Sequence, residues 1–233
     1  MASSLFGKAY TLLKTRPAEF FSAVRGYLLF SYTRLYFQLL GIPEGVTLGQ
    51  NIRIQRARSL QVERSGALLN VGDHSILYEH ALVEVRGDGR VEIGRESILG
   101  DIRIVCRNSI TIGSHFLSSW NVFLQDFDPH PLVGSERQKQ VASMVRDFRP
   151  QFDSPEFDQC ERYSFQFPSE PIVIGTNVWV GANVTILKGV TIGDNSIVAT
   201  GAVVLRGEYP PNSVLAGNPA RVVKTLHSNE KPS

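Results

Sequence analysis

The feature that most constrains this chain is a six-residue spacing of aliphatic side chains near its C-terminal end. Between Ile172 and Arg206 a β-branched residue recurs at every sixth position, namely Ile174, Val180, Ile186, Ile192, Val198 and Val204. A glycine directly follows three of them, at Gly175, Gly181 and Gly193. An alternating strand explains a period of two but not this recurrence of glycine, and an amphipathic helix requires spacings of three and four.

Six residues can supply a short strand and a bend, so three such units form one coil of a triangular prism of about 18 residues. The aliphatic side chains of successive coils then stack inside the prism. The Val, Ile, Thr, Gly and Asn content of this stretch also disfavours helix. The sequence therefore predicts a mainly β fold, a solenoid whose coils pair only with their neighbours.

Earlier coils are looser. The pairs Leu48-Gly49, Val71-Gly72, Ile93-Gly94 and Ile112-Gly113 recur 23, 22 and 19 residues apart, which indicates coils with small corner insertions. From Ile112 the hexad continues through Ser118 and Leu124 and is then lost until Ile174. One coil therefore carries a long excursion, residues 126–171, whose prolines are expected to oppose both helix and sheet. A loop of this length is typical of a functional or a disordered segment.

The N-terminal segment, residues 1–45, is rich in Phe, Tyr and Leu and carries more basic than acidic side chains. A helix is predicted from about Ala18 to Leu40, with Pro17 at its start and Gly41 and Pro43 at its end. Its apolar residues at spacings of three and four are Phe20, Val24, Leu28, Tyr32, Leu35 and Leu39. Two alternatives stay open: a cap packed on the first coil or between subunits, and peripheral contact of residues 1–41 with a membrane.

At the other end, Pro210-Pro211 is expected to break the solenoid, and the residues up to about Leu226 to add a short final strand or helix. Residues 227–233 form a polar tail. The expected organisation is a helical segment at 1–45, a β-helix domain at 46–226 that includes the excursion, and this tail.

Composition excludes several classes of protein. The 233 residues suit one domain, and Lys+Arg 24 against Asp+Glu 22 gives a net charge of +2, too balanced to indicate a nucleic-acid partner. Arg25 and Arg34 interrupt the apolar N-terminal stretch before it reaches the roughly 20 residues of a membrane span. Cys106 and Cys160 form no disulfide framework and are expected to be buried thiols. We therefore expect a cytoplasmic protein, at the inner face of the membrane if residues 1–41 contact it.

Several segments resemble a known family. Ile172–Val190, Val190–Pro211 and the AGNPARVV run at Ala216–Val223 are similar to the hexapeptide-repeat acyltransferases, particularly their galactoside and maltose O-acetyltransferase branch. The His130-Pro131 pair and Tyr163-Ser164-Phe165 match that branch too. The resemblance is strong over residues 172–224, weaker back to about residue 70, and absent from 1–45. It implies a left-handed parallel β-helix, a homotrimer, and acetyl-CoA as co-substrate with no permanently bound cofactor.

The resemblance also assigns roles to residues. His130 corresponds to the general base that activates an acceptor hydroxyl for direct attack on the thioester, a role suited to imidazole at neutral pH. The pantetheine arm of acetyl-CoA would pass, in a groove between parallel solenoids, the residues Trp179, Gly181, Ala182, Thr200 and Gly201. Arg206 and Arg221 would lie near the coenzyme A phosphates, with Lys224 as a further candidate.

The expected activity is O-acetylation of a saccharide, such as a surface-polysaccharide or glycolipid precursor. N-acylation of an amino sugar or nucleotide sugar, and a non-catalytic scaffold, are the alternatives. The Leu99-Gly100-Asp101 run lacks the asparagine that the family places before its histidine, so the acceptor is expected to differ from a free galactoside or maltose. Asp126 and Asp128 either orient His130 or serve the loop turn. The histidines at 74, 80, 115 and 130 do not reproduce the zinc spacing of γ-class carbonic anhydrases, so no metal is expected.

Overall fold

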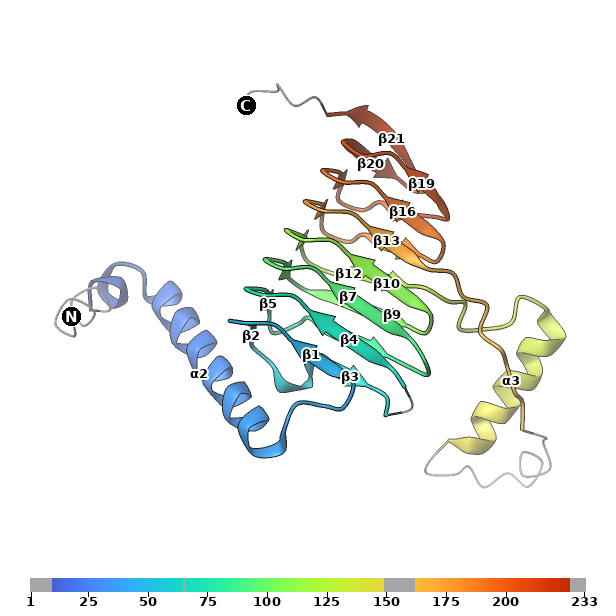
Figure 1. Ribbon diagram of the computed structural model, residues 1–233, viewed down its shortest axis with the longest axis horizontal. Helices are drawn as coiled ribbons and strands as arrows, with labels where there is room; N and C mark the ends of the chain where they lie inside the picture. The colour runs from blue at the N-terminus through green and yellow to red at the C-terminus, as the bar shows by residue number, and fades with distance from the viewer. Residues whose placement is uncertain (1–9, 65, 149–161, 227–233) are drawn as a thin grey trace.

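The computed structural model describes residues 10–64, 66–148 and 162–226. The predicted tail at 227–233 and Cys160 lie outside these residues. Three parallel sheets of 7, 8 and 6 strands stack along one axis, and successive strands pass from one sheet to the next around a triangular prism (Figure 1). The predicted fold class, a left-handed parallel β-helix with an N-terminal helix and one long excursion, is confirmed.

Each sheet takes one strand from each coil. Sheet A contains β1 Val46–Leu48, β4 Leu68–Val71, β7 Arg90–Ile93, β10 Ser109–Ile112, β13 Ile172–Ile174, β16 Val190–Ile192 and β19 Gly207–Tyr209. Sheet B contains β2 Arg53–Ile54, β5 Ile76–Leu77, β8 Ile98–Leu99, β11 Leu117–Ser118, β14 Trp179–Val180, β17 Ile197–Val198, β20 Ser213–Gly217 and the antiparallel β21 Ala220–Thr225. Sheet C contains β3 Leu60–Val62, β6 Leu82–Val85, β9 Ile102–Cys106, β12 Val122–Gln125, β15 Thr185–Leu187 and β18 Val203–Val204. A short 3-10 helix, η1 Ala57–Ser59, precedes β3.

The hexad residues form the core, as predicted. All six aliphatic residues of the repeat are at most 1% exposed, and Ser118 and Leu124 of the earlier coil are buried with them. Leu48, Val71, Ile93 and Ile112 lie one above another in sheet A, which confirms the looser coils. Inward side chains stack coil upon coil because parallel pairing repeats the same register at every step.

The recurring glycine has a steric cause. Gly94 follows β7 at the corner between sheets A and B, and a Cβ there would collide with the backbone nitrogen of Ser114 in the next coil. At Gly113 the added atom would lie 2.7 Å from the backbone of Gly175. Real Cβ atoms do not approach backbone this closely, so only glycine permits the coils to pack at their normal spacing.

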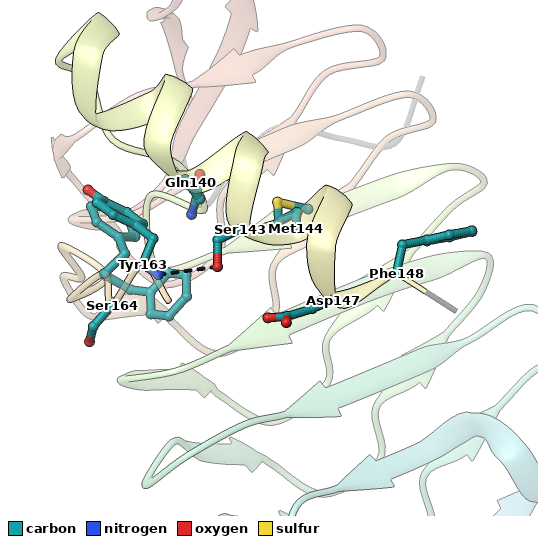
Figure 2. A pocket seen from close by; sticks show the side chains of 9 residues that line it. Gln140, Ser143, Met144, Asp147, Phe148, Tyr163 and Ser164 are labelled. Carbon is teal, nitrogen blue, oxygen red and sulfur yellow. Dashed lines mark hydrogen bonds between the residues drawn. The ribbon is translucent and has the colours of Figure 1, made fainter. Parts of the chain in front are cut away.

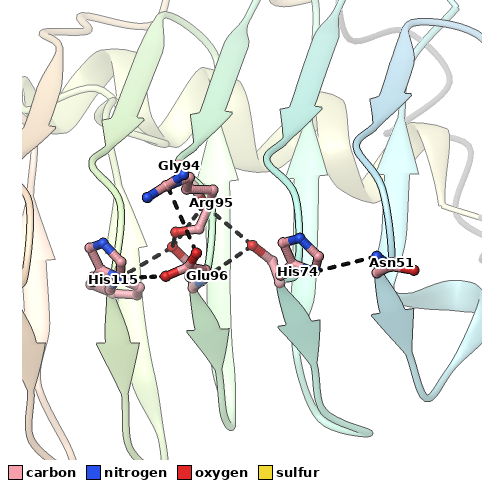
Figure 3. A network of polar contacts seen from close by, with 9 residues as sticks. Asn51, His74, Gly94, Arg95, Glu96 and His115 are labelled. Carbon is pink, nitrogen blue, oxygen red and sulfur yellow. Dashed lines mark hydrogen bonds and ion pairs between the residues drawn. The ribbon is translucent and has the colours of Figure 1, made fainter.

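A polar ladder runs along the same corner (Figure 3). Asn51, His74, Glu96 and His115 all adopt positive φ, between 55° and 59°, at equivalent places in successive coils. Asn51 Nδ2 lies 3.5 Å from His74 Nδ1, and His115 Nδ1 lies 3.1 Å from Glu96 Oε2. The ladder thus accounts for two of the histidines. Among the described residues, no three His, Cys, Asp or Glu side chains are grouped so that they could hold a metal ion.

The predicted N-terminal helix is present as α2, Pro17–Leu40. It lies beside the first coil and contacts β2 and η1 (Figure 1). Thr33 is buried and its hydroxyl donates to the Gln55 carbonyl at 3.1 Å, Phe37 packs on the core, and Arg25 pairs with Glu79 at 2.6 Å. The stripe of Val24, Leu28, Tyr32, Leu35 and Leu39 is exposed. No helix in the described part of the chain is both long and apolar enough to span a bilayer.

Two expectations about proline are wrong. Pro210-Pro211 does not break the solenoid, because it occupies the corner between β19 and β20, where the bend replaces ladder pairing, and both strands continue their sheets. The solenoid ends instead at β21, which pairs antiparallel with β20. The excursion contains a helix, α3 Gly134–Asp147, since Pro131 precedes it and Pro150 follows it without interrupting it.

Candidate active site

The excursion is anchored at its base. We call its described residues, 126–148 and 162–171, the arm. Phe127 forms an antiparallel bridge with Ser169, the Asp128 amide donates to the Pro168 carbonyl at 2.8 Å, and the Glu170 amide donates to the Asp126 carbonyl at 2.9 Å. The outgoing and returning chains are therefore held side by side where they leave the prism.

Asp126 fastens this base to the prism. Its carboxylate is fully buried and accepts the Arg107 and Asn108 amides, each at 2.8 Å. The Cys106 thiol donates to it at 3.2 Å. Burial, and then the charge of Asp126, raise the pKa of the Cys106 thiol far above its usual range. Cys106 is thus a buried, protonated thiol. The Asp126 carboxylate bonds to Cys106 and to the Arg107 and Asn108 amides, and not to His130.

Aromatic packing stiffens the arm. The Phe127 and Phe167 rings meet edge to face at 5.6 Å, and Phe165 meets Phe167 at 5.2 Å. The guanidinium carbon of Arg107 stands 3.9 Å from the centre of the Phe167 ring. A stacked arginine of this kind contributes about 0.5–2 kcal/mol. The return segment is therefore packed on the prism corner.

Two ion pairs connect the arm to the corner between sheets C and A. Lys188, just after β15, bonds to Asp128 at 2.7 Å. Glu170 pairs with Arg206, just after β18, at 3.1 Å. Asp128 therefore faces Lys188 and not the imidazole of His130. Neither flanking aspartate orients His130 within this chain.

His130 is exposed and contacts a residue of α3 instead. Its Nδ1 atom lies 2.9 Å from Gln140 Oε1. The amide nitrogen of Gln140 points the other way and donates to the Pro129 carbonyl at 3.4 Å. Because a donating amide nitrogen assigns the oxygen to the histidine side, Nδ1 is the atom that carries the proton in neutral His130. The Nε2 atom is then the proton acceptor.

An open pocket of about 540 Å³ lies between α3 and the return segment (Figure 2). Its walls include Gln140, Ser143 and Met144 from the helix, and Tyr163 and Phe165 from the return segment. The Tyr163 amide donates to the Ser143 hydroxyl at 3.2 Å, which joins the two walls. Gln140 thus belongs both to this pocket and to the contact with His130.

A second hydrogen bond joins the pocket walls. The Tyr163 hydroxyl bonds to the Glu136 carboxylate on α3. Hydrogen bonds from Lys139 and Tyr163 hold the pKa of Glu136 below its ordinary value. Desolvation and the bond to Glu136 raise the pKa of Tyr163, so its hydroxyl stays protonated at neutral pH.

The residues expected along the pantetheine chain of acetyl-CoA form one patch, which we call the donor corner. It comprises Trp179, Gly181, Ala182, Thr200 and Gly201, on sheet B and at the corner between sheets B and C. Trp179 is half exposed and its indole nitrogen donates to Ser119 Oγ at 3.4 Å. A Cβ on Gly181 would lie 2.7 Å from the Thr200 nitrogen, so coil packing already requires that glycine. At Gly201, with φ +77°, the space is open.

The two arginines expected near phosphate do not lie together. Arg206 is at the corner between sheets C and A, with its side chain 75% exposed. Arg221 is exposed on β21 at the end of sheet B, where it donates to the Ala220 carbonyl at 2.7 Å. His130 and Arg206 therefore share one corner of the prism, whereas the donor corner is a different edge. One chain alone does not bring these groups into a single cleft.

Several residues at these corners were not predicted from the sequence. Gln140 and Lys188 belong to no sequence motif, because their partners lie 10 and 60 residues away and the arm has no repeating pattern. Trp120 is 75% exposed, and its carbonyl accepts a hydrogen bond from the backbone amide of Asn183 in the next coil at 2.8 Å. The repeated Asn-Val pair at 121–122 and 183–184 was a usable signal for this register.

Comparisons with known proteins bear on both the repeat and the whole chain. A family model described as bacterial transferase hexapeptide (six repeats) matches residues 171–206. Galactoside O-acetyltransferase of Escherichia coli (strain K12) is 48% identical over 199 residues, which cover 82% of this chain and 84% of that protein.

Two solved structures share the fold. The polySia-specific acetyltransferase NeuO gives a TM-score of 0.51 at 22% identity, covering 81% of this chain and 66% of that one. A point mutant of AntD, an N-acyltransferase from Bacillus cereus, in complex with dTDP and coenzyme A, gives a TM-score of 0.58 at 16% identity, covering 82% of this chain and 89% of that one. At these identities the likeness concerns the architecture alone.

Proposed function

This chain belongs to the hexapeptide-repeat acyltransferase family, and from that premise we propose that it transfers an acetyl group from acetyl-CoA to a saccharide hydroxyl. Its similarity to a galactoside O-acetyltransferase over most of both chains supports the reaction class. The observation that carries the assignment of the base is the contact between His130 and Gln140, in an arm that is anchored to the solenoid at its base.

The proposed chemistry needs no covalent enzyme intermediate. The acceptor oxygen attacks the thioester carbon of acetyl-CoA while His130 Nε2 takes the hydroxyl proton. The tetrahedral intermediate collapses, the carbon–sulfur bond breaks, and the departing sulfur receives the proton from Nε2. The products are an acetyl ester and coenzyme A. Gln140 supports this cycle because it accepts a hydrogen bond from Nδ1 in both the neutral and the protonated ring.

We place the acetyl-CoA site between subunits of a homotrimer. His130 and the donor corner occupy different edges of the same prism, and parallel packing of prisms would put one subunit's arm against its neighbour's donor corner. The pantetheine chain of acetyl-CoA then lies along Trp179, Gly181, Ala182, Thr200 and Gly201. Arg206 and Arg221 are exposed and available to the coenzyme phosphates.

The acceptor is proposed to bind against the arm, in the pocket between α3 and the return segment. Tyr163 and Phe165 are stacked there with ring centres 6.4 Å apart, and aromatic faces beside amide and hydroxyl groups suit a sugar ring. A surface-polysaccharide or glycolipid precursor is the proposed acceptor class, because a pocket on an open, projecting arm leaves room for the rest of a large acceptor.

The test is an acetyl-transfer assay with acetyl-CoA and a panel of free sugars, oligosaccharides, amino sugars and nucleotide sugars. Acetylation of a hydroxyl, located by NMR of the product, supports the proposal. His130→Ala should keep its oligomeric state and acetyl-CoA binding while kcat falls by about 10²–10⁴. Amide products alone would establish N-acylation instead. Wild-type turnover in His130→Ala would reject His130 as the base.

A further inference from the structure

Two stripes of residues run along α2. One faces the prism and contains Gly26, Phe30, Thr33 and Phe37, spaced by three and four residues, with Thr33 buried and the others partly covered. The other, which we call the outer stripe, contains Val24, Leu28, Tyr32, Leu35 and Leu39, with exposures from 40% to 73%. An ordinary surface helix buries its apolar stripe and exposes polar residues. In contrast, α2 has a second apolar face that the prism does not cover.

The outer stripe is held in place on the prism. Thr33 bonds to the Gln55 carbonyl, Arg25 pairs with Glu79 in the second coil, and Phe37 packs against the core. Rotation of α2 about its own axis would break all three interactions. The outer stripe therefore points away from the solenoid and remains available to a partner.

The charge around α2 indicates the kind of partner. Residues 10–64 carry eight Lys and Arg against three Asp and Glu, whereas the whole chain has a net charge of only +2. Arg53 lies beside α2 in a shared cleft, and η1, which α2 contacts, includes Arg58 and directly follows Arg56. These three arginines are exposed. The apolar stripe and the excess positive charge thus occupy the same end of the solenoid.

We propose that α2 and the first coil form a docking surface for an anionic phospholipid bilayer, with the outer stripe lying in the interface and the arginines on lipid headgroups. Large exposed apolar surfaces flanked by basic residues bind lipid through both burial and charge. A second copy packed through the same stripe would bring two positively charged N-terminal regions together. An anionic surface neutralises them. The proposal does not depend on which acceptor the enzyme uses.

The test measures co-sedimentation of the full chain with phosphatidylcholine vesicles, with and without phosphatidylglycerol. The wild type should bind the anionic vesicles at least about tenfold more tightly than the neutral ones, and salt should weaken the binding. The variant Leu28→Glu/Leu35→Glu should lose it. The matched control, Val141→Glu/Met144→Glu, adds the same charges at equally exposed apolar positions of α3 and should bind like wild type.

A second pair of variants tests the charge alone. Arg56→Gln/Arg58→Gln should weaken binding to anionic vesicles about tenfold, whereas Arg90→Gln/Arg95→Gln in the third coil should not. Circular dichroism and light scattering accompany each variant. Equal binding of wild type to both vesicle types would overturn the proposal. So would an outer-stripe variant that changes the oligomeric state while wild type ignores vesicles, because a second copy would then cover the stripe.

Discussion

His130 Nδ1 lies 2.9 Å from Gln140 Oε1, and the opposite side of the same amide bonds to the Pro129 carbonyl. The contact spans ten residues and joins the loop that carries the histidine to α3. It selects the imidazole tautomer whose Nε2 is unprotonated. In the proposed mechanism this amide takes the orienting role that a carboxylate has in hydrolytic triads.

The first prediction concerns that amide. Gln140→Leu should lower kcat about tenfold with little change in KM for acetyl-CoA, because the imidazole loses its preferred tautomer but the donor site is untouched. Gln140→Glu keeps an oxygen that accepts from Nδ1–H and should recover most of the rate. NMR of the imidazole nitrogens should show the Nε2-protonated form only in Gln140→Leu. Equal losses in both variants would indicate a merely structural role.

The second prediction tests whether the site lies between chains. His130→Ala and Thr200→Trp should each be nearly inactive alone. After unfolding and refolding of an equal mixture, about a quarter of wild-type activity should return, since each inter-subunit site then has even odds of an intact histidine and of an intact donor corner. A site within one chain would return none. Refolded wild type supplies the reference value.

The third prediction separates the two arginines. Arg206→Ala and Arg221→Ala should each raise the apparent KM for acetyl-CoA more than that for the acceptor, since charge-assisted hydrogen bonds to phosphate contribute about 1.5–3 kcal/mol. Dephospho-acetyl-CoA, which lacks the 3′-phosphate, should reveal which arginine contacts that group. The variant of that arginine should no longer distinguish the two donors. An unchanged donor KM in both variants would place the phosphates elsewhere.

The fourth prediction follows from Glu84, which is buried in sheet C. Burial opposes its ionisation, but hydrogen bonds from Arg86 and Arg103 outweigh this and hold the pKa of Glu84 below its usual 4.5. A carboxyl whose pKa is lower in the folded state stabilises the fold above its unfolded pKa and loses that effect as pH falls through the folded one. Acid should therefore destabilise the protein below about pH 4.5.

Glu84→Gln should cost about 1–3 kcal/mol of unfolding free energy at pH 7, and the difference from wild type should shrink in acid. Glu92→Gln, an exposed change in sheet A, is the control and should be near neutral at both pH values. Urea unfolding at pH 7 and in acid gives the comparison. A pH-independent difference between Glu84→Gln and wild type would contradict the assignment.

The fifth prediction compares two glycines. Gly94→Ala places a Cβ against the backbone of the next coil, whereas Gly87→Ala, at φ +60°, meets open space and costs only about 1 kcal/mol for its left-handed conformation. Gly94→Ala should thus lower Tm at least twice as much as Gly87→Ala. Similar shifts in the two variants would show that backbone conformation, and not coil spacing, explains the glycine repeat.

Periodicity accounts for what the sequence predicted well. Each hexad aliphatic must face inward in every coil, so one stretch of tight repeat was enough to identify the strands, the inward residues and the looser early coils. The same reasoning failed at Pro210-Pro211. A hexad contains corners as well as strands, and proline is tolerated at a corner.

The remaining features depend on contacts that no period encodes. His130–Gln140 and Asp128–Lys188 join residues 10 and 60 positions apart through a non-repeating arm. On α2, apolar residues surround the helix, so composition did not indicate the inner face. The small side chains of Gly26 and Thr33 decide it, because they let the helix approach sheet B closely.

The antiparallel base of the arm makes the arm structurally separate from the solenoid coils. The chain leaves the solenoid after β12 and rejoins it at β13 of the next coil, and residues 126–128 lie beside 168–170. The whole insertion therefore occupies the place of a single corner between two strands. The arm can be lengthened, shortened or exchanged without altering the register of a single coil. Under the proposed function, changes in the arm that keep His130 and Gln140 are therefore a direct route to a different acceptor on an unchanged donor corner.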